Sequence, residues 1–261
     1  MNILQVNNLK TYFYSRHGIT RAVDDLTFKI KKGMVFGLVG ESGSGKTLTA
    51  LSIMGLVSLP GKIMGGQAIF DGADLLAMDD DRLRGIRGCQ ISIVFQEPST
   101  ALNPVFTIGY QVQEAILAHQ DIGKKKAKEL AMEYLKKVHI AKPDRVFDNY
   151  PHQLSGGAKQ RAMIAASLVN SPDLLILDEP TTALDVTTQA RILELLEEII
   201  ESGNCSILFI THDFDIIARM CDEVGVMRSG KIVEMGSIGQ ILNNPKESYT
   251  VSLLESAKAL A

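Results

Sequence analysis

The sequence has few cysteines, and they do not occur at the spacing of a metal site. Cys89, Cys205 and Cys221 lie far apart in the chain and form no CxxC pair. Zinc ribbons, iron–sulfur clusters and disulfide-stabilised scaffolds need closely spaced or paired cysteines. The cysteine pattern argues against these three classes and favours a reducing cytosol.

The chain also lacks a long apolar run, a hydrophobic N-terminus and an excess of basic residues. Its longest charge-free stretches, 47–61 and 98–113, are interrupted by polar residues and fall short of the ~18 apolar residues of a membrane span. The N-terminal sequence MNILQVNNLK contains no signal-peptide core. Lys and Arg number 27 against 30 Asp and Glu, which argues against a nucleic-acid binder held by bulk electrostatics. We therefore expect a soluble chain that meets a membrane only through a partner.

The 261 residues have the composition of a globular protein, with 46% hydrophobic and 22% charged residues. This length suits one large α/β unit or a domain with an insertion. Short apolar runs predict buried strands at residues 34–39, 91–95, 174–177 and 207–210. Helices are predicted at residues 48–56 and 189–200. Apolar residues at helical spacing in 124–139 indicate that 97–153 is a helical insertion. Alternating strands and helices predict a parallel sheet covered on both faces.

Residues 40–47, GESGSGKT, match the phosphate-loop pattern G-x-x-x-x-G-K-[ST] and follow the apolar run 34–39. Glycines let backbone N–H groups curve around phosphate oxygens, and the next helix directs its N-terminus at the same anion. The pattern places Lys46 at the β- and γ-phosphates and the Thr47 hydroxyl at Mg²⁺. The alternative is a glycine-rich turn with an incidental lysine. The loop predicts a nucleotide site without distinguishing a kinase, a GTPase or a transporter.

Two acidic residues follow the apolar run 174–177. Asp178 is placed at the strand end to hold Mg²⁺, directly or through water. Glu179 is a candidate base for the attacking water. Taken alone, this pair fits equally well two acids that end a strand and cap the next segment.

A second anion-binding helix end is predicted at Leu154-Ser155-Gly156-Gly157, which opens the apolar run 162–169. One nucleotide needs one phosphate loop, so a second such helix end in the same chain suggests that it serves the nucleotide of another copy. The alternative is an ordinary serine N-cap.

These motifs, with Gln96, Ala183-Leu184-Asp185 and His212, carry a family resemblance. The chain resembles the nucleotide-binding subunit of ATP-binding cassette (ABC) transporters from Leu4 to about Leu254. The resemblance implies an α/β fold: a P-loop NTPase core with a mixed sheet, an N-terminal antiparallel β subdomain and an inserted α-helical subdomain. It assigns 1–96 and 154–240 to the ATP-binding core, 97–153 to the helical subdomain with the permease contact, and 241–261 to a C-terminal tail.

The resemblance also implies the cofactors ATP and Mg²⁺ and a role for each motif residue. It implies catalytic roles for Glu179, His212, Gln96 and Lys46, and metal contacts for Thr47, Gln96 and Asp178. Phe13 matches the aromatic residue that stacks on adenine, with Tyr12 and Tyr14 as neighbouring candidates. The remaining nucleotide contacts that the resemblance implies are Gly40, Glu41, Ser42, Gly43, Ser44, Gly45, Lys46, Thr47, Thr49, Ser155, Gly156, Gly157 and Asp185.

The implied partners are membrane permease subunits, a second ATPase subunit that is the same chain or a homologue, and indirectly an extracytoplasmic substrate-binding protein; no nucleic acid is expected. The implied location is the cytoplasmic face of the inner membrane. Residues 96–104 and the segment Asn244-Pro245-Lys246 resemble the peptide and nickel importer branch. The short tail favours nickel or another metal complex as cargo, with a dipeptide or oligopeptide as the alternative. A non-transport ABC ATPase acting on DNA or ribosomes, and an unrelated P-loop kinase or GTPase, remain as other functions.

Overall fold

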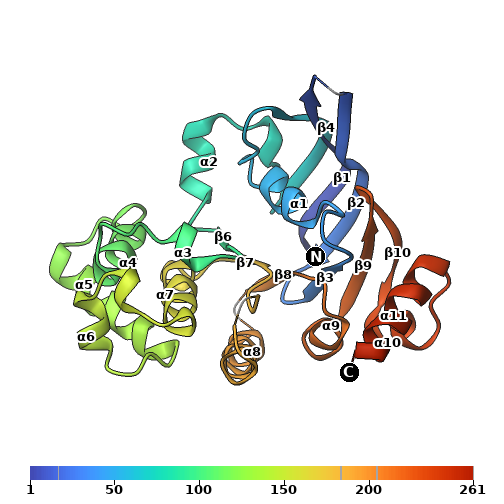
Figure 1. The fold of residues 1–261 in the computed structure, drawn as a ribbon. Coiled ribbons are helices and arrows are strands. Elements are labelled where there is room, and N and C mark those ends of the chain that lie inside the picture. Colours follow the sequence, from blue (N-terminus) through green and yellow to red (C-terminus); the bar gives the residue numbers. More distant parts are fainter. Residues whose placement is uncertain (17, 183, 204, 261) are drawn as a thin grey trace. The chain divides into compact units, whose positions relative to one another are not determined.

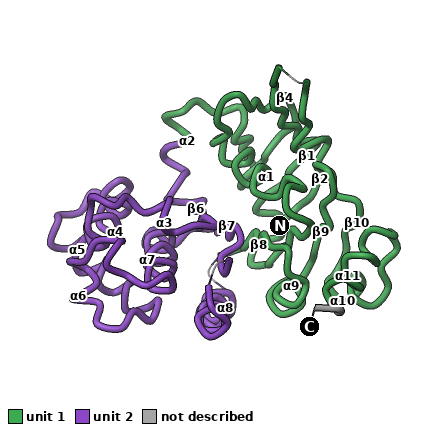
Figure 2. The backbone as a smooth tube through the Cα atoms, viewed as in Figure 1, with its two compact units in different colours: residues 1–83, 206–261 green, residues 84–205 purple. Residues whose placement is uncertain are grey.

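The structure is a computed structural model that describes all residues of the chain except His17, Ala183, Asn204 and Ala261. The chain forms two compact units, Met1–Leu83 with Ser206–Ala261, and Arg84–Cys205 (Figure 2). Each unit is described by itself. In the part of the chain that the structure describes, no helix combines the length and apolar character needed to cross a bilayer.

The first unit begins with an antiparallel sheet in the order β2-β1-β4-β5 (Figure 1). The apolar residues Leu4, Val6, Leu26, Phe28 and Ile30 are all buried, as their alternation along the chain predicts. The strands of this sheet are β1 (Asn2–Ser15), β2 (Gly18–Lys31), β4 (Gly61–Phe70) and β5 (Ala73–Asp74).

A second set of strands in the first unit has the order β10-β9-β3-β8. β3 is parallel to both β8 and β9, whereas β10 is antiparallel to β9, so the predicted mixed sheet is confirmed. The strands are β3 (Val35–Val39), β8 (Ser206–Thr211), β9 (Glu223–Arg228) and β10 (Lys231–Ser237). The helices of this unit are α1 (Lys46–Ile53), the 3₁₀ turn η1 (Leu75–Ala77), α9 (Phe214–Met220), α10 (Ile238–Asn243) and α11 (Ser248–Leu260); α2 (Asp80–Ile86) continues into the second unit.

The second unit carries the parallel strand pair β6 (Ile91–Val94) and β7 (Leu174–Asp178) with a group of helices. Among these helices, α4 and α6 pack closely: the Phe147 ring of α6 lies against Gly109 of α4, where an added Cβ would collide with the ring. The helices are α3 (Pro98–Ala101), α4 (Ile108–Leu117), α5 (Lys124–Lys137), α6 (Pro143–Asp148), the 3₁₀ turn η2 (Pro151–Gln153), α7 (Gly156–Leu168) and α8 (Val186–Glu201). The predicted helical segment 97–153 lies inside this unit, which also takes in α7, β7 and α8. The boundaries predicted at residues 97, 153 and 241 stay predictions.

Candidate functional site

The phosphate loop joins the buried strand β3 to helix α1, as its sequence predicts. Gly43 and Gly45 have φ of 78° and 107°, in the region that favours glycine. At Gly40 a Cβ would collide with the carbonyl oxygen of Met227 in β9, so a side chain has no room there. The backbone of the loop is therefore held in a shape that glycine alone permits.

Lys46 is almost fully buried, and the loop itself holds its ammonium group. Lys46 Nζ donates to the carbonyl oxygens of Gly40 at 2.7 Å and Glu41 at 2.9 Å. Helix α1 begins at Lys46, and its N-cap residue Gly45 provides no side-chain cap. The buried Ser44 hydroxyl has no hydrogen-bond partner among the described residues. Donors gathered around a helix N-terminus in this way fit a phosphate group.

The turn between β9 and β10 supports the loop from the same unit. The N–H of Gly230 donates to the Ser44 carbonyl at 2.9 Å, and the Gly230 carbonyl accepts from the N–H of Asp24 at 2.8 Å. Thr49 is fully buried, and its hydroxyl donates to the Gly45 carbonyl at 3.0 Å. Thr49 therefore supports the loop from within α1, and its predicted nucleotide contact stays a prediction.

The three aromatic residues near the end of β1 have different environments. Phe13 is half-buried, and its ring covers Gly61 so closely that a Cβ there would lie 2.7 Å from Phe13 Cζ. The Tyr12 hydroxyl donates to Asp24 Oδ1 at 2.7 Å, and this bond is the main cause of a lowered pKa at Asp24. Tyr14 is exposed, and its hydroxyl lies 3.3 Å from the sulfur of Met64. The structure thus engages Phe13 in packing, and its assignment to adenine stays a prediction.

In the second unit, the structure brings Gln96 and Glu179 together, although 83 positions separate them in the chain. Gln96 Nε2 donates to Glu179 Oε2 at 3.1 Å, and the Thr182 hydroxyl donates to the same oxygen at 2.8 Å. Glu179 has φ of 46°, a conformation that costs a non-glycine residue about 1–3 kcal/mol and is concentrated at functional sites. Asp178, one residue earlier, is 1% exposed at the end of β7. Sequence reasoning missed Thr182, because only the turn after β7 brings its hydroxyl back to the carboxylate.

The signature sequence opens helix α7, with Ser155 as its N-cap. Ser155 Oγ accepts from the N–H of Ala158 at 3.4 Å, so this serine caps the helix. The anion site predicted at the same residue stays a prediction. A Cβ at Gly157 would collide with the Thr188 methyl group, and one at Gly156 would lie 3.5 Å from Leu184. Gly157 therefore allows the start of α7 to lie close to the first turn of α8, whereas a side chain at Gly156 would make an ordinary contact.

Asp185 caps helix α8, and it holds Thr188 in the position that packs against Gly157. Asp185 accepts from the Thr188 hydroxyl at 2.7 Å and from the Thr188 N–H at 3.0 Å, and these bonds lower the pKa of Asp185. Sequence reasoning missed Thr188, which lies one turn into the helix. Ala183, part of the same motif, lies outside the described residues.

His212 follows the buried Thr211 at the end of β8 in the first unit and is exposed. The next residue, Asp213, caps α9 by accepting from the N–H groups of Asp215 and Ile216. The predicted site is therefore distributed over both units, with Lys46, Thr47 and His212 in the first. Gln96, Asp178, Glu179 and the signature belong to the second.

Comparison with known proteins gives a consistent family. The family model described as ABC transporter matches residues 23–182. The chain is 47% identical over 255 residues to the oligopeptide transport ATP-binding protein AppD of Bacillus subtilis, covering 97% of this chain and 78% of the relative. It is 42% identical over 261 residues to the dipeptide transport ATP-binding protein DppD of Escherichia coli, covering 100% of this chain and 80% of the relative.

Solved structures agree with these relatives. The dimeric structure of MJ0796, a bacterial ABC transporter cassette, superposes with a TM-score of 0.80 and 28% identity, covering 90% of this chain and 98% of that one. A dimeric post-hydrolysis state of MJ0796 bound to ADP and Pi superposes with a TM-score of 0.81 and 27% identity, covering the same shares of both chains.

Replacing Lys46 by alanine removes the ammonium group that is predicted to contact the nucleotide phosphates. We expect the affinity for ATP to fall by about 10–100-fold, the value of one lost charge-assisted hydrogen-bond donor. Titration with a fluorescent ATP analogue measures the change, and Lys62→Ala, at an exposed lysine of β4, is the matched control. Equal affinity of Lys46→Ala and wild type would contradict the assignment of the loop.

Proposed function

The chain belongs to the ABC transporter family, and from this membership we propose that it energises peptide uptake through a separate membrane permease. As a member it is an ABC-type ATPase, the ATP-hydrolysing subunit of an importer. The observation that carries the proposal is the presence, in one chain, of a phosphate loop with a buried, unpaired Ser44 hydroxyl and a serine-capped signature helix. This pair of features supports the transport assignment over a P-loop kinase or GTPase.

ATP binding begins at the phosphate loop. The N–H groups at the start of α1 and the buried Ser44 hydroxyl would receive phosphate oxygens, and the Lys46 ammonium would turn from the loop carbonyls to the β- and γ-phosphates. Binding then exchanges two neutral acceptors for charged ones, which shortens and strengthens the hydrogen bonds of Lys46. Phe13 is proposed as the adenine contact.

Glu179 is proposed as the base for hydrolysis. Water attacks the γ-phosphorus, its proton passes to the Glu179 carboxylate, and the bond from the γ-phosphorus to the bridging oxygen breaks. Gln96 and Thr182 both donate to Glu179 Oε2, so the carboxylate is oriented before the substrate arrives. His212 is proposed to contact the γ-phosphate from the end of β8.

The donors proposed for Mg²⁺ are the Thr47 hydroxyl, the Gln96 amide and the Asp178 carboxylate. All three offer oxygen atoms, the ligand type that Mg²⁺ prefers, and few protein ligands suffice because nucleotide phosphates supply others. Within the described residues, no group of three or more His, Cys, Asp or Glu side chains could hold an ion unaided. The donor set therefore fits a metal that arrives with ATP, where it neutralises charge that develops on the phosphates.

We propose that two ATPase subunits share each nucleotide. Ser155, Gly156 and Gly157 of one subunit would hold the γ-phosphate bound to the loop of the other, and Asp185 would lie at the subunit boundary. The structures of MJ0796 that superpose on this chain are dimeric. The partner is a second copy of this chain or a homologous cassette.

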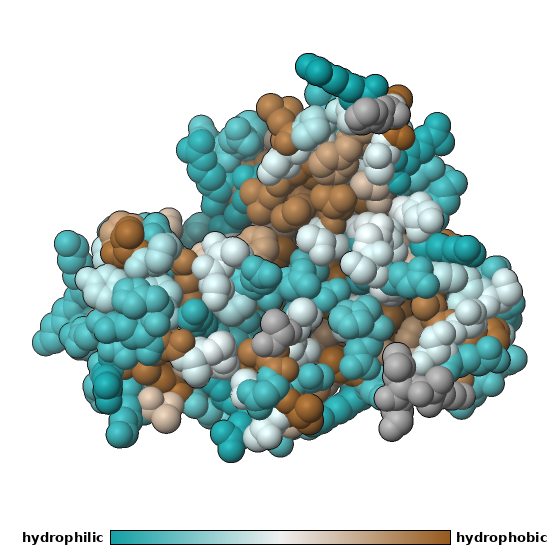
Figure 3. Space-filling view, in the orientation of Figure 1, coloured by the Kyte–Doolittle hydropathy of each residue, from teal (hydrophilic) through white to brown (hydrophobic). Residues whose placement is uncertain are grey.

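The contact with the permease is proposed on the helical segment that follows Gln96. Val105, Phe106 and Tyr110 are 68%, 40% and 47% exposed, although all three are large and apolar or aromatic. The rings of Phe106 and Tyr110 stack with centroids 4.6 Å apart. Figure 3 shows apolar surface among hydrophilic surface over this part of the second unit. An exposed aromatic pair of this kind is typical of a protein–protein contact. Docking on a permease through this pair would hold the chain at the cytoplasmic face of the membrane.

Peptide is the cargo that the relatives favour. AppD and DppD are named for oligopeptide and dipeptide transport, and a probable peptide ABC transporter protein of Sinorhizobium fredii is 45% identical over 255 residues. Nickel, the cargo that the sequence analysis favours, has no comparable support among these relatives. A substrate-binding protein outside the membrane would select the peptide. The same relatives favour an importer over an ABC ATPase acting on DNA or ribosomes.

Glu179→Gln keeps the shape of the side chain and removes its basicity. We expect kcat for ATP hydrolysis to fall by about 10²–10⁴-fold with ATP affinity unchanged. Because bond cleavage slows while the phosphate contacts remain, ATP should hold paired subunits together, which size-exclusion chromatography detects. Glu201→Gln, at the exposed end of α8, serves as the control. Hydrolysis by Glu179→Gln at the wild-type rate would exclude Glu179 as the base.

The combined change of Phe106→Asp and Tyr110→Asp tests the permease contact. Placing carboxylates in an apolar interface leaves unpaired charges there, so we expect the chain to lose co-purification with the permease. ATP hydrolysis by the isolated chain should stay at the wild-type rate. Ile19→Asp introduces the same charge at an apolar residue that is 59% exposed in the first unit. Retention of the permease by the double variant would place the contact elsewhere.

Uptake measurements distinguish the two cargoes. In a strain that lacks this chain, we expect loss of dipeptide uptake, normal nickel uptake, and recovery on expression of wild type. Expression of Glu179→Gln should fail to restore uptake. Loss of nickel uptake with normal dipeptide uptake would overturn the peptide assignment and leave the ATPase assignment intact.

A further inference from the structure

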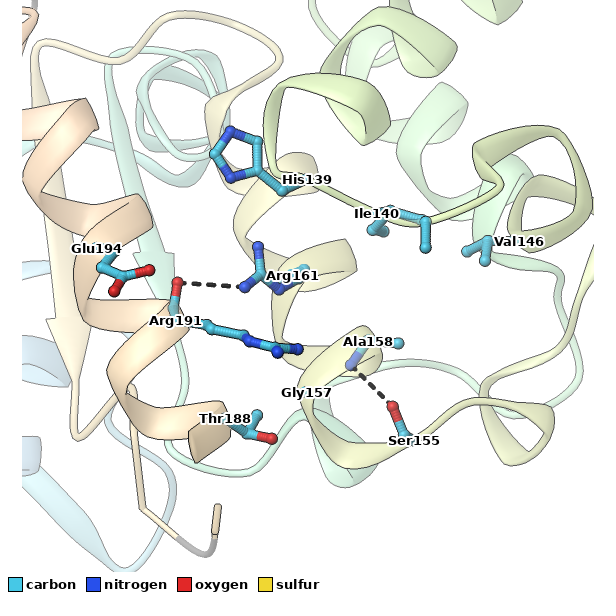
Figure 4. A pocket seen from close by; sticks show the side chains of 11 residues that line it. His139, Ile140, Val146, Ser155, Gly157, Ala158, Arg161, Thr188, Arg191 and Glu194 are labelled. Atoms are coloured by element: carbon cyan, nitrogen blue, oxygen red, sulfur yellow. Dashed lines mark hydrogen bonds between the residues drawn. The ribbon is translucent and has the colours of Figure 1, made fainter. Parts of the chain in front are cut away.

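A cavity of about 490 Å³ lies inside the second unit, beside the signature helix. Its walls come from the segment around His139, from the start of α7 and from the first turns of α8 (Figure 4). Ile140 and Val146 form an apolar wall, and Ser155 and Gly157 belong to the signature itself. The cavity therefore adjoins residues that we propose to hold a γ-phosphate.

Two guanidinium groups line the cavity, and one of them is fixed in place. Arg161 donates from Nη1 to the Val138 carbonyl at 2.9 Å and from Nη2 to the Arg191 carbonyl at 3.2 Å. These two bonds use part of the five N–H donors of a guanidinium and leave others to face a ligand. Arg161 is half-buried. Burial lowers the pKa of its guanidinium, and the nearby charge of Arg191 lowers this pKa further.

Arg191 supplies the second guanidinium. Among the described residues, its side chain makes no hydrogen bond or ion pair, and it extends across the cavity toward Ala158 (Figure 4). Glu194 is the one acidic residue of the lining, and the carboxylate of Glu198 is engaged by His139, with Nε2 and Oε2 3.3 Å apart. The lining holds two guanidinium groups and one carboxylate, and Glu194 and Glu198 offset part of the repulsion between the two arginines.

We propose that this cavity binds a small oxyanion, and that its source is the inorganic phosphate released by hydrolysis. A guanidinium group presents parallel N–H donors that match the oxygens of phosphate or carboxylate, so the two arginines define the ligand class. The position selects phosphate, because Ser155 and Gly157 line both this cavity and the proposed γ-phosphate contact. This step rests on the proposed function. Bound phosphate would join α7 to α8 after the bond has broken.

Binding of inorganic phosphate tests the proposal without requiring hydrolysis. Phosphorus NMR titrations use the full chain carrying Lys46→Ala, which weakens phosphate binding at the loop. Adding Arg191→Ala should weaken the remaining binding by about tenfold or more, the value of a lost charge-assisted contact. Arg191→Lys keeps the charge and should restore part of it. Lys125→Ala removes an exposed cation of α5 that does not line the cavity and should change nothing.

Three results would overturn the proposal. The first is an absence of phosphate binding in the Lys46→Ala chain, and the second is equal binding with and without Arg191. The third is binding of succinate at least as tight as that of phosphate, which would assign the cavity to a carboxylate. These titrations measure phosphate binding and not ATP hydrolysis or transport. Failure of the proposed function would therefore appear in the hydrolysis and uptake measurements, and failure of this proposal in the titrations.

Discussion

The backbone of Gly40 runs so close to the Met227 carbonyl that no Cβ fits between them, and this contact fixes the course of the phosphate loop. Val39 and Val226 are register partners in the parallel strands β3 and β9, so the loop leaves one strand beside the end of the next. The Gly230 N–H holds the Ser44 carbonyl from the turn that follows β9. The position of the loop thus depends on backbone pairing in the sheet. The donors that we propose to bind phosphate are in place because the sheet has formed.

The second unit organises its part of the chemistry by a different means. Glu179 adopts a left-handed backbone conformation directly after the buried strand β7, and donors from two other segments then fix its carboxylate. The signature helix and α8 begin side by side because Gly157 leaves room for Thr188, which Asp185 holds by two hydrogen bonds. A movement of Thr188 at the start of α8 would therefore displace Gly157 of the signature. The proposed phosphate cavity lies between these same two helices.

The contiguous motifs could be predicted from the sequence, because all residues of each motif lie at fixed spacing within one short segment. The phosphate loop occurs between the predicted strand and helix, and Asp178 ends a buried strand as expected. The helix predicted over 189–200 begins earlier, at Val186, because Asp185 caps it and offsets the weak helix propensity of the β-branched residues that follow.

Contacts that depend on turn geometry or on the packing of separate segments could not be predicted. The bonds of Thr182 to Glu179 and of Thr188 to Asp185 depend on turn geometry, and those of Arg161 to Val138 and Arg191 depend on how separate helices pack. Phe13, Tyr12 and Tyr14 are three consecutive aromatic residues, so the sequence offers little to separate their roles. Only the register of β1 against its neighbours shows that the Phe13 ring packs over Gly61.

We propose that each nucleotide is shared between two subunits, with the phosphate loop of one subunit facing the signature of the other. Mixing a Lys46→Ala chain with a Ser155→Arg chain tests it directly, because each variant lacks a different half of the site. Each should be inactive alone, and the mixture should regain ATP hydrolysis, since a mixed pair contains one intact site. A mixture as inactive as its components, or full activity of a strictly monomeric chain, would contradict the account.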